Sequence, residues 1–226
     1  MTVYRINYLA RRHPQWTHAA WVPRWRRHWR LAEPRPESAT VRRYIQCEVL
    51  HDADPVPHDG VASAEYVSLA ARHANRAAAG YHRIMRQDEV QVFDSLIADC
   101  SFIGSHHVVF GAGTGPFKVV RFLKRRASVA AGDFVRAWRG LHGARMIEAW
   151  PAMLSYAQNV AVVPERPDGW GLNVDGSEEL WFDALAPAVA CATSETLQRI
   201  GSHLFTVTAT VVTDEVILKD ARDPSA

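Results

Sequence analysis

Two short stretches far apart in the chain alternate between apolar and polar residues. Residues 3–9 and 117–123 both show a period of two, which is typical of a half-buried β-strand. Each stretch ends in the same four-residue pattern, Leu-x-Arg-Arg, at residues 9–12 and 123–126. A strand and its following motif that recur together indicate an internal repeat.

An amphipathic stripe follows each predicted strand. Its members are Trp21, Trp25 and Trp29 in the first half and Phe134, Trp138 and His142 in the second. A spacing of four keeps each set on one face of a helix. We therefore expect a helix after each strand, with this face turned toward a sheet.

Three further matches occur in the same order in both halves. RYIQ at 43–46 matches SYAQ at 155–158, FDSL at 93–96 matches FDAL at 182–185, and IGSH occurs at 103–106 and 200–203. The order predicts strand, helix, strand, strand, helix, strand in each half. Such a unit forms an antiparallel sheet with both helices on one face, and two units can cover each other's open faces. The predicted fold is α+β: two tandem ferredoxin-like βαββαβ repeats, residues 1–112 and 116–226, that form an intrachain dimeric α+β barrel.

The two halves differ most between their second and third strands. The FDSL match places the third strand of the first half next to residues 93–96. Residues 52–88 then become an insertion, with an alanine-rich helix over residues 63–79. The alternative alignment places that third strand at residues 60–68. The FDSL match to FDAL is the preferred alignment.

Composition and charge exclude several classes of protein. Of the 226 residues, 48% are apolar and the net charge is only +2, which fits an ordinary globular protein without a field that recruits nucleic acid. The chain has no apolar run of ~20 residues and no signal-peptide core, so we expect a cytoplasmic protein that does not bind membranes. The three cysteines, Cys47, Cys100 and Cys191, are too far apart for a metal site, and no metal is predicted.

The repeat pattern resembles the EthD family of the dimeric α/β-barrel superfamily. In the second half the resemblance is carried by Leu123, Arg125, Arg126, Phe134, Trp138, His142, Tyr156, Gln158, Asn159, Glu179, Leu180, Trp181, Phe182, Asp183 and Leu185. In the first half it is carried by Arg11, Arg12, Trp21, Trp25, Arg43, Tyr44, Gln46, Phe93, Asp94 and Leu96. It implies the barrel fold and one pocket per half, between helices and sheet. Superfamily relatives include polyketide cyclases, dehydratases, lactone isomerases, quinone-forming monooxygenases and haem-binding enzymes.

His142 is the first candidate for chemistry. It follows Trp138 by one helical turn and therefore points toward the sheet with it. A desolvated, neutral imidazole can take or give a proton, as acid–base catalysis requires. In the first half Trp29 occupies the matching position, and His28 is turned away by ~100° toward the pocket flank or solvent. We therefore expect the active pocket in the second half.

Other candidates lie on the predicted strands. Tyr156 and Tyr44 open the second strand of each half, and Gln158 shares a strand face with Tyr156. Arg121 lies mid-strand and could hold an oxygen that gains negative charge; the alternative is a structural ion pair with Glu179 or Asp183. Asn7 is the position aligned with it in the first half.

Two histidines and several aromatic residues complete the candidate site. His106 and His203 end the repeated IGSH motif, and some superfamily relatives place a catalytic histidine on the strand that follows. The aromatic wall of the second pocket is predicted to be Phe134, Trp138 and Trp181. Trp25 and His28 would border the first pocket.

The sequence thus predicts a small-molecule enzyme that uses acid–base catalysis without an organic cofactor. The reaction would be an isomerisation, elimination, dehydration or cyclisation of a hydrophobic carbonyl-bearing or aromatic metabolite from a degradation or polyketide-like pathway. Two alternatives stay open: a haem-binding or oxygen-using enzyme with His142 or His203 as axial ligand, and a non-catalytic carrier of a hydrophobic ligand. The chain would be a monomer that contains its own pseudo-dimer, or a homodimer.

Overall fold

A computed structural model describes residues 2–52, 57–162 and 171–221. The first half contains β1 (Val3–Ala10), α1 (His18–Ala32), the 3₁₀ turn η1 (Pro36–Thr40), β2 (Val41–Asp52), β3 (Gly60–Tyr66), α2 (Leu69–Ala77), α3 (Ala79–Val92) and β4 (Ser101–Phe110). The second half contains β5 (Phe117–Arg125), α4 (Ala131–Ala137), the π-helical turn η2 (Trp138–His142), α5 (Gly143–Ala149), β6 (Ser155–Ala161), β7 (Gly176–Phe182), α6 (Leu185–Ala192), α7 (Glu195–Arg199), β8 (Phe205–Asp214) and β9 (Val216–Asp220).

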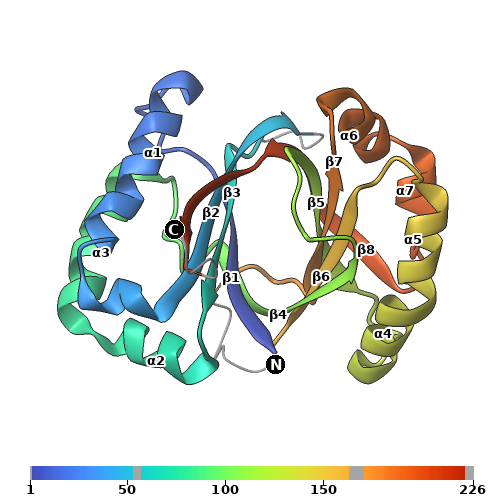
Figure 1. The fold of residues 1–226 in the computed structure, drawn as a ribbon, viewed down its shortest axis with the longest axis horizontal. Helices are drawn as coiled ribbons and strands as arrows, with labels where there is room; N and C mark the ends of the chain where they lie inside the picture. The colour runs from blue at the N-terminus through green and yellow to red at the C-terminus, as the bar shows by residue number, and fades with distance from the viewer. Residues whose placement is uncertain (1, 53–56, 163–170, 222–226) are drawn as a thin grey trace.

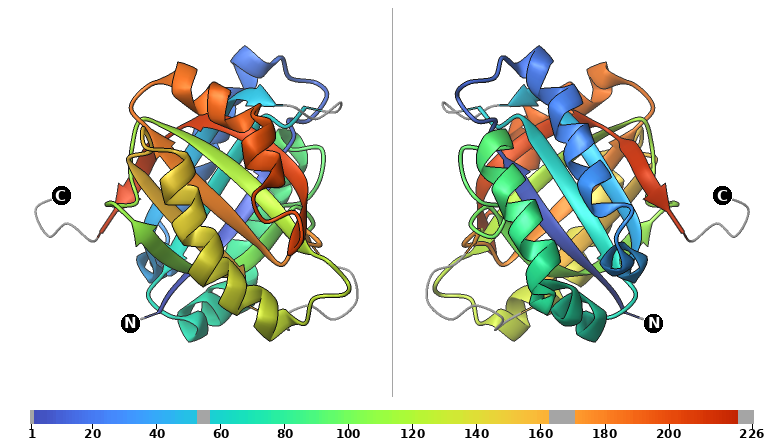
Figure 2. Two further views of the ribbon diagram at one scale, coloured as in Figure 1. Left: turned by 90° about the vertical axis from the view of Figure 1, so that its right-hand side faces the viewer. Right: turned by 90° about the vertical axis from the view of Figure 1, so that its left-hand side faces the viewer.

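The described strands form one antiparallel sheet that closes into a barrel. The order is β3-β1-β4-β6-β7-β5-β8-β2-β9, and β3 also pairs with β2, which closes the ring. The two halves join where β4 pairs with β6 and where β8 pairs with β2. Helices α1–α3 cover one side of the barrel and α4–α7 cover the opposite side (Figures 1 and 2). The predicted α+β barrel built from two halves is confirmed.

The two predicted helical stripes face the sheet as expected. Helix α1 begins after Thr17, whose side chain accepts a hydrogen bond from the Ala20 amide at 3.3 Å. All six stripe residues are buried. In the second half the helix runs from α4 through η2 into α5, so Trp138 and His142 lie at the two ends of a π-helical turn. A π-turn of this kind is rare and often marks a functional position.

The predicted insertion in the first half is wrong. The described part of residues 52–88 holds β3, α2 and most of α3, and residues 60–66 are a strand that pairs with both β1 and β2. The alternative third strand was therefore the correct one. Most alanines of the predicted helix lie in α2, which is helical, so only the first part of that prediction falls on β3. At the start of β3 a small residue is required, because a Cβ on Gly60 would lie 2.6 Å from the Trp25 ring.

Two of the sequence matches do not mark equivalent positions. Phe182 ends β7, whereas Phe93 follows α3 and forms only an isolated bridge with Arg12. Residues 103–106 lie within β4, whereas residues 200–203 form the turn before β8. These similarities in sequence therefore overstated the symmetry of the two halves.

The barrel interior combines an apolar layer with a layer of charged residues. Leu9, Phe102, Val120 and Phe122 belong to the apolar layer. The charged layer contains Arg5 with Glu65 at 3.3 Å, Lys118 with Glu179 at 3.0 Å, and Lys118 with Glu215 at 3.2 Å. Glu215 lies between β8 and β9, where the chain changes its register against β2. The charged layer pairs side chains of both halves, because Arg5 Nη1 also lies 3.9 Å from Glu179.

Among the described residues, no helix is long and apolar enough to cross a membrane.

Candidate functional site

A single buried carboxylate, Glu178 of β7, organises the polar groups between sheet and helices in the second half. Its Oε1 accepts a hydrogen bond from Arg121 Nη1 at 2.5 Å. Its Oε2 accepts from Tyr156 Oη at 2.7 Å, His142 Nε2 at 3.0 Å and Trp138 Nε1 at 3.2 Å. We call these five residues the Glu178 cluster. Glu178 is fully buried, so four donors replace the water that its charge has lost.

The sheet register and one glycine bring these groups together. Arg121 of β5 lies directly opposite Glu178 in the β5–β7 ladder, and Tyr156 lies on the neighbouring strand β6. A Cβ on Gly176 would lie 2.6 Å from the Trp138 ring, so only glycine lets the indole reach over the sheet to Glu178. The cluster therefore depends on the exact pairing of three strands and the helix above them.

The electrostatics of the cluster keep Glu178 ionised. Burial alone raises the pKa of Glu178, but the Arg121 charge, then His142 and the hydrogen bonds, outweigh it and hold the pKa at about 2. Burial, followed by the Glu178 charge, raises the pKa of Tyr156 well above its usual value. Because the carboxylate is ionised, His142 Nε2 must carry the hydrogen that it shares with Glu178. The other ring nitrogen, Nδ1, has no hydrogen-bond partner among the described residues.

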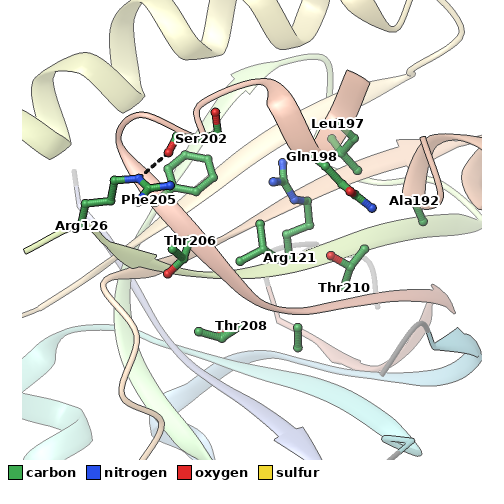
Figure 3. Close-up of a pocket in the computed structure, with 12 residues that line it drawn as sticks. Arg121, Arg126, Ala192, Leu197, Gln198, Ser202, Phe205, Thr206, Thr208 and Thr210 are labelled. Atoms are coloured by element: carbon green, nitrogen blue, oxygen red, sulfur yellow. Dashed lines mark hydrogen bonds between the residues drawn. The ribbon is translucent and has the colours of Figure 1, made fainter. Parts of the chain in front are cut away.

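A pocket of about 370 Å³ opens beside the cluster, between α6–α7 and the first half of β8. Its lining residues are Arg121, Arg126, Ala192, Leu197, Gln198, Ser202, Phe205, Thr206, Val207, Thr208, Ala209 and Thr210. Figure 3 shows the Arg121 guanidinium extending between the Phe205 ring and Gln198. The Nη2 atom of Arg121 is buried and has no partner among the described residues. The volume of the pocket falls in the range of small-molecule sites.

The other members of the Glu178 cluster lie behind the wall of this pocket. His142, Tyr156, Trp138 and Glu178 are absent from the lining. Phe205 separates His142 from the pocket, with ring centroids 5.3 Å apart and planes at 79°. Only Arg121 belongs to both the pocket and the cluster.

The first half builds a similar arrangement from uncharged groups. Trp25 Nε1 donates to Tyr8 Oη at 2.9 Å, the hydroxyls of Tyr8 and Tyr44 lie 2.9 Å apart, and Gln46 Nε2 donates to Tyr44 Oη at 3.1 Å. Trp29 stacks on Tyr44 at 4.5 Å between ring centroids. The first site is thus filled by aromatic rings, as the tryptophan at this position indicated.

The predicted match between Asn7 and Arg121 is wrong by one residue. Asn7 points into the barrel, where its amide nitrogen lies 3.5 Å from the Arg5 carbonyl oxygen. Tyr8 occupies the position that corresponds to Arg121. Its hydroxyl forms hydrogen bonds with Trp25 and Tyr44, just as Arg121 forms its hydrogen bond with Glu178 within the cluster. The ion pair of Arg121 is with Glu178, not with Glu179 or Asp183.

Three other predicted site residues lie elsewhere. Trp181 points into the barrel, where its Nε1 donates to Glu215 at 3.0 Å, so it does not line the second pocket. His203 is exposed in the turn before β8 and is absent from the pocket lining. His106 lies in the barrel with Nδ1 2.9 Å from Asn159 Oδ1; burial, then the Arg5 charge, lowers its pKa to about 3.

His28 was predicted to point toward a pocket flank or solvent, and this prediction is wrong. It is buried, with Nδ1 2.6 Å from Asp88 Oδ2. The His28–Asp88 pair holds α1 against α3, and Arg24 also forms an ion pair with Asp88. Gln158 donates to Tyr156 Oη at 3.0 Å, and Phe134 stacks on Trp138 at 5.0 Å between centroids. None of these residues belongs to the pocket lining, so Phe134 and Trp138 do not form the predicted aromatic wall of this pocket.

The surroundings of His142 do not fit haem ligation. Nε2 is engaged by Glu178, and the space beside Nδ1 is filled by the Gly201 turn and by Phe205; a Cβ on Gly201 would lie 2.8 Å from Nδ1. An axial ligand needs open space for a flat macrocycle around the metal–nitrogen bond, and neither nitrogen offers it. In addition, the described residues contain no group of three or more His, Cys, Asp or Glu side chains arranged to hold a metal ion.

No protein-family model matches the chain, and no curated protein matches it in sequence. Solved structures do match. A candidate chlorite dismutase covers 96% of this chain and 95% of its own with 8% identity and a TM-score of 0.59. An anthrone oxidase-like protein covers 97% and 94% with 8% identity and a TM-score of 0.57. A mutant chlorite dismutase from Candidatus Nitrospira defluvii covers 95% and 91% with 11% identity and a TM-score of 0.54. At these identities the likeness concerns the fold, and the chain has the fold of the dimeric α+β barrel proteins.

Proposed function

We propose that this protein is a small-molecule enzyme that uses acid–base catalysis without an organic cofactor. Its site would be the pocket of the second half. The observation that supports this most is the position of Arg121, which lines the pocket, binds Glu178 through Nη1 and keeps Nη2 buried without a partner among the described residues. A buried donor without a partner costs free energy, so a ligand oxygen that satisfies it is bound favourably.

Arg121 would stabilise an oxygen that becomes negatively charged during the reaction. When a proton leaves the carbon next to a carbonyl group, the electron pair moves onto the carbonyl oxygen, and a fixed guanidinium stabilises that enolate. His142 would take the proton at Nδ1, because Nε2 already donates to the ionised Glu178. The resulting imidazolium would lie against a carboxylate, and return of the proton to a different atom would complete an isomerisation or set up an elimination.

Phe205 has to move for this step. Its ring stands between the pocket and His142, and it is the aromatic residue of the pocket lining. Rotation of this ring, together with a shift of the Gly201 turn that lies beside Nδ1, would join the two spaces. Replacement of Phe205 by alanine is therefore expected to speed proton transfer while it weakens ligand packing.

A non-catalytic carrier is the second candidate. It is favoured by the absence of His142, Tyr156 and Glu178 from the pocket lining. In a carrier the Glu178 cluster would only hold Arg121 in place. The two candidates differ in whether bound ligand exchanges carbon-bound protons.

The test is hydrogen–deuterium exchange in D₂O, followed by proton NMR, with phenylpyruvate and 2-tetralone as probes. The enzyme proposal predicts exchange above the buffer rate in the wild type and at least a tenfold loss in His142→Gln, with probe affinity unchanged. A carrier predicts binding without exchange in both proteins. His13→Gln, outside the pocket and the cluster, is the matched histidine control and should exchange like the wild type. A strong visible absorption band in the purified protein would instead support the haem-dependent alternative.

A further inference from the structure

We infer that the second-half pocket is a site for small aromatic monocarboxylates. This ligand class is assigned to the same pocket as the proposed function, and it rests on that function in this respect only. The observations that carry it are the charges in the lining, the unpaired nitrogen of Arg121 and the orientation of the threonine hydroxyls.

The charges around the pocket favour an anion. Among its lining residues are two arginines, Arg121 and Arg126, and no carboxylate. Arg126 Nε donates to the Ser202 carbonyl oxygen at 2.5 Å, which fixes its side chain along the wall. Arg121 is 1% exposed, so its charge acts through protein rather than through bulk water. Arg121 and Arg126 therefore supply the positive charge of the pocket lining.

The same charges favour one negative charge over two. The Arg121 charge is already balanced by Glu178, so Arg126 is the net positive charge of the lining. A monocarboxylate brings the total near zero. A phosphate dianion would leave excess negative charge in a partly enclosed site, because the Glu178 carboxylate already neutralises Arg121 through a 2.5 Å hydrogen bond.

The rest of the pocket fits a flat apolar body. Phe205 forms one wall and lies beneath the Arg121 guanidinium, with 5.6 Å between Cζ and the ring centroid. Ala192, Leu197 and Ala209 supply further apolar surface. An aromatic ring between Phe205 and the α7 side would stack on one face and keep its carboxylate within reach of Arg121.

The threonines of β8 add a preference for a hydroxyl on that ring. Thr206 Oγ1 donates to the Lys124 carbonyl oxygen at 3.3 Å, and Thr208 Oγ1 donates to the Phe122 carbonyl oxygen at 3.1 Å. Their hydrogens are used within the sheet, so these oxygens can accept but not donate. They suit a ligand hydroxyl rather than a second carboxylate.

The test compares three probes that share a naphthalene ring: 1-hydroxy-2-naphthoate, its methyl ester and 1-naphthyl phosphate. Isothermal titration is expected to show the carboxylate binding at least tenfold more tightly than either of the others. Equal affinity for the ester would overturn the role of charge, and tighter binding of the phosphate would overturn the monoanion assignment.

Variants locate the binding. Arg121→Met in the background of Glu178→Gln removes the buried pair as a unit, so folding is preserved better than in either single variant. It should lower naphthoate affinity at least tenfold. Gln198→Trp on the exposed side of α7 should block the pocket without burying a new group in the core. Arg136→Gln, exposed on α4, is the arginine control.

The outcomes separate this inference from the proposed function. Naphthoate binding at Arg121 without any proton exchange by the ketone probes would support the ligand class and refute the enzyme. Proton exchange that depends on His142, with no preference for the carboxylate, would support the enzyme and refute the ligand class. Undiminished naphthoate binding in both the Arg121 and the Gln198 variants would place the ligand outside this pocket and overturn the inference.

Discussion

Replacement of Glu178 by glutamine tests the physical account of the buried cluster. Glutamine keeps the volume and one acceptor oxygen, but it removes the negative charge and turns an amide donor toward groups that are donors themselves. Arg121 would be left as a buried cation without a counterion. Loss of one partner from such a pair typically costs about 3–5 kcal/mol of unfolding free energy. We expect a loss of that size at pH 7.

The pKa of Glu178 gives a second measure of the same quantity. A fall from 4.5 to about 2 corresponds to a stabilisation on the order of 3 kcal/mol. A carboxyl whose folded pKa is lowered stabilises the protein above its unfolded pKa and loses that effect as the pH falls through its folded pKa. By pH 3 about 2 kcal/mol of the wild-type advantage should be gone. The wild type and the variant should therefore converge in acid.

Urea unfolding at pH 7, 5 and 3 measures this gap. Glu195→Gln is the control, since Glu195 is exposed on α7 and lies 3.9 Å from Arg199 in a solvent-screened pair; it should unfold like the wild type. A Glu178→Gln protein within about 1 kcal/mol of the wild type at pH 7 would contradict the burial argument. A gap that is the same at all three pH values would contradict the ionisation argument.

Two further predictions concern Gly201 and His106. Gly201→Ala should destabilise the fold by about 1–3 kcal/mol, because φ is +82° and the new Cβ would lie 2.5 Å from the Phe205 ring. Gly140→Ala is the control and should not destabilise the fold, because a Cβ there meets nothing within 4 Å. Equal unfolding midpoints for the two variants would refute this prediction. His106 should stay uncharged down to about pH 4 in an NMR titration, because burial and the Arg5 charge lower its pKa to about 3. The unfolded chain binds this proton more readily, so the stability of the fold should decrease as the pH falls from about 6.5 to 3. An ordinary histidine titration would show that the site is hydrated.

The local patterns were sufficient for the fold but not for the faces of every strand. The helical stripes and the first strands were predicted as elements because each is a short-range pattern of apolar and polar residues. In β7 every residue is buried, so its alternation gives no contrast between the two faces. Glu178 was therefore overlooked and its neighbour Trp181 was assigned to the pocket, whereas the register places Glu178 toward the helices and Trp181 inside.

Long-range register explains the remaining errors. Glu178 and His142 are 36 residues apart in sequence, and the paired residues of β1 and β3 are at least fifty positions apart, so nothing local specifies these contacts. Phe205 was not considered because its importance comes from where β8 begins beside α7. The clearest available signal for Glu178 was its acidity: a buried carboxyl needs a cationic partner, and a mid-strand arginine such as Arg121 needs an anionic one.

The covalent link between the two halves has an evolutionary consequence. In a barrel assembled from two identical chains, every substitution appears twice, so a change that fills one pocket fills both. Here Tyr8 and Trp29 could replace the charged and titratable groups in one copy while Arg121 and His142 were retained in the other. Because both halves lie in one chain, one half can keep a dense aromatic core while the other keeps the charged and titratable groups.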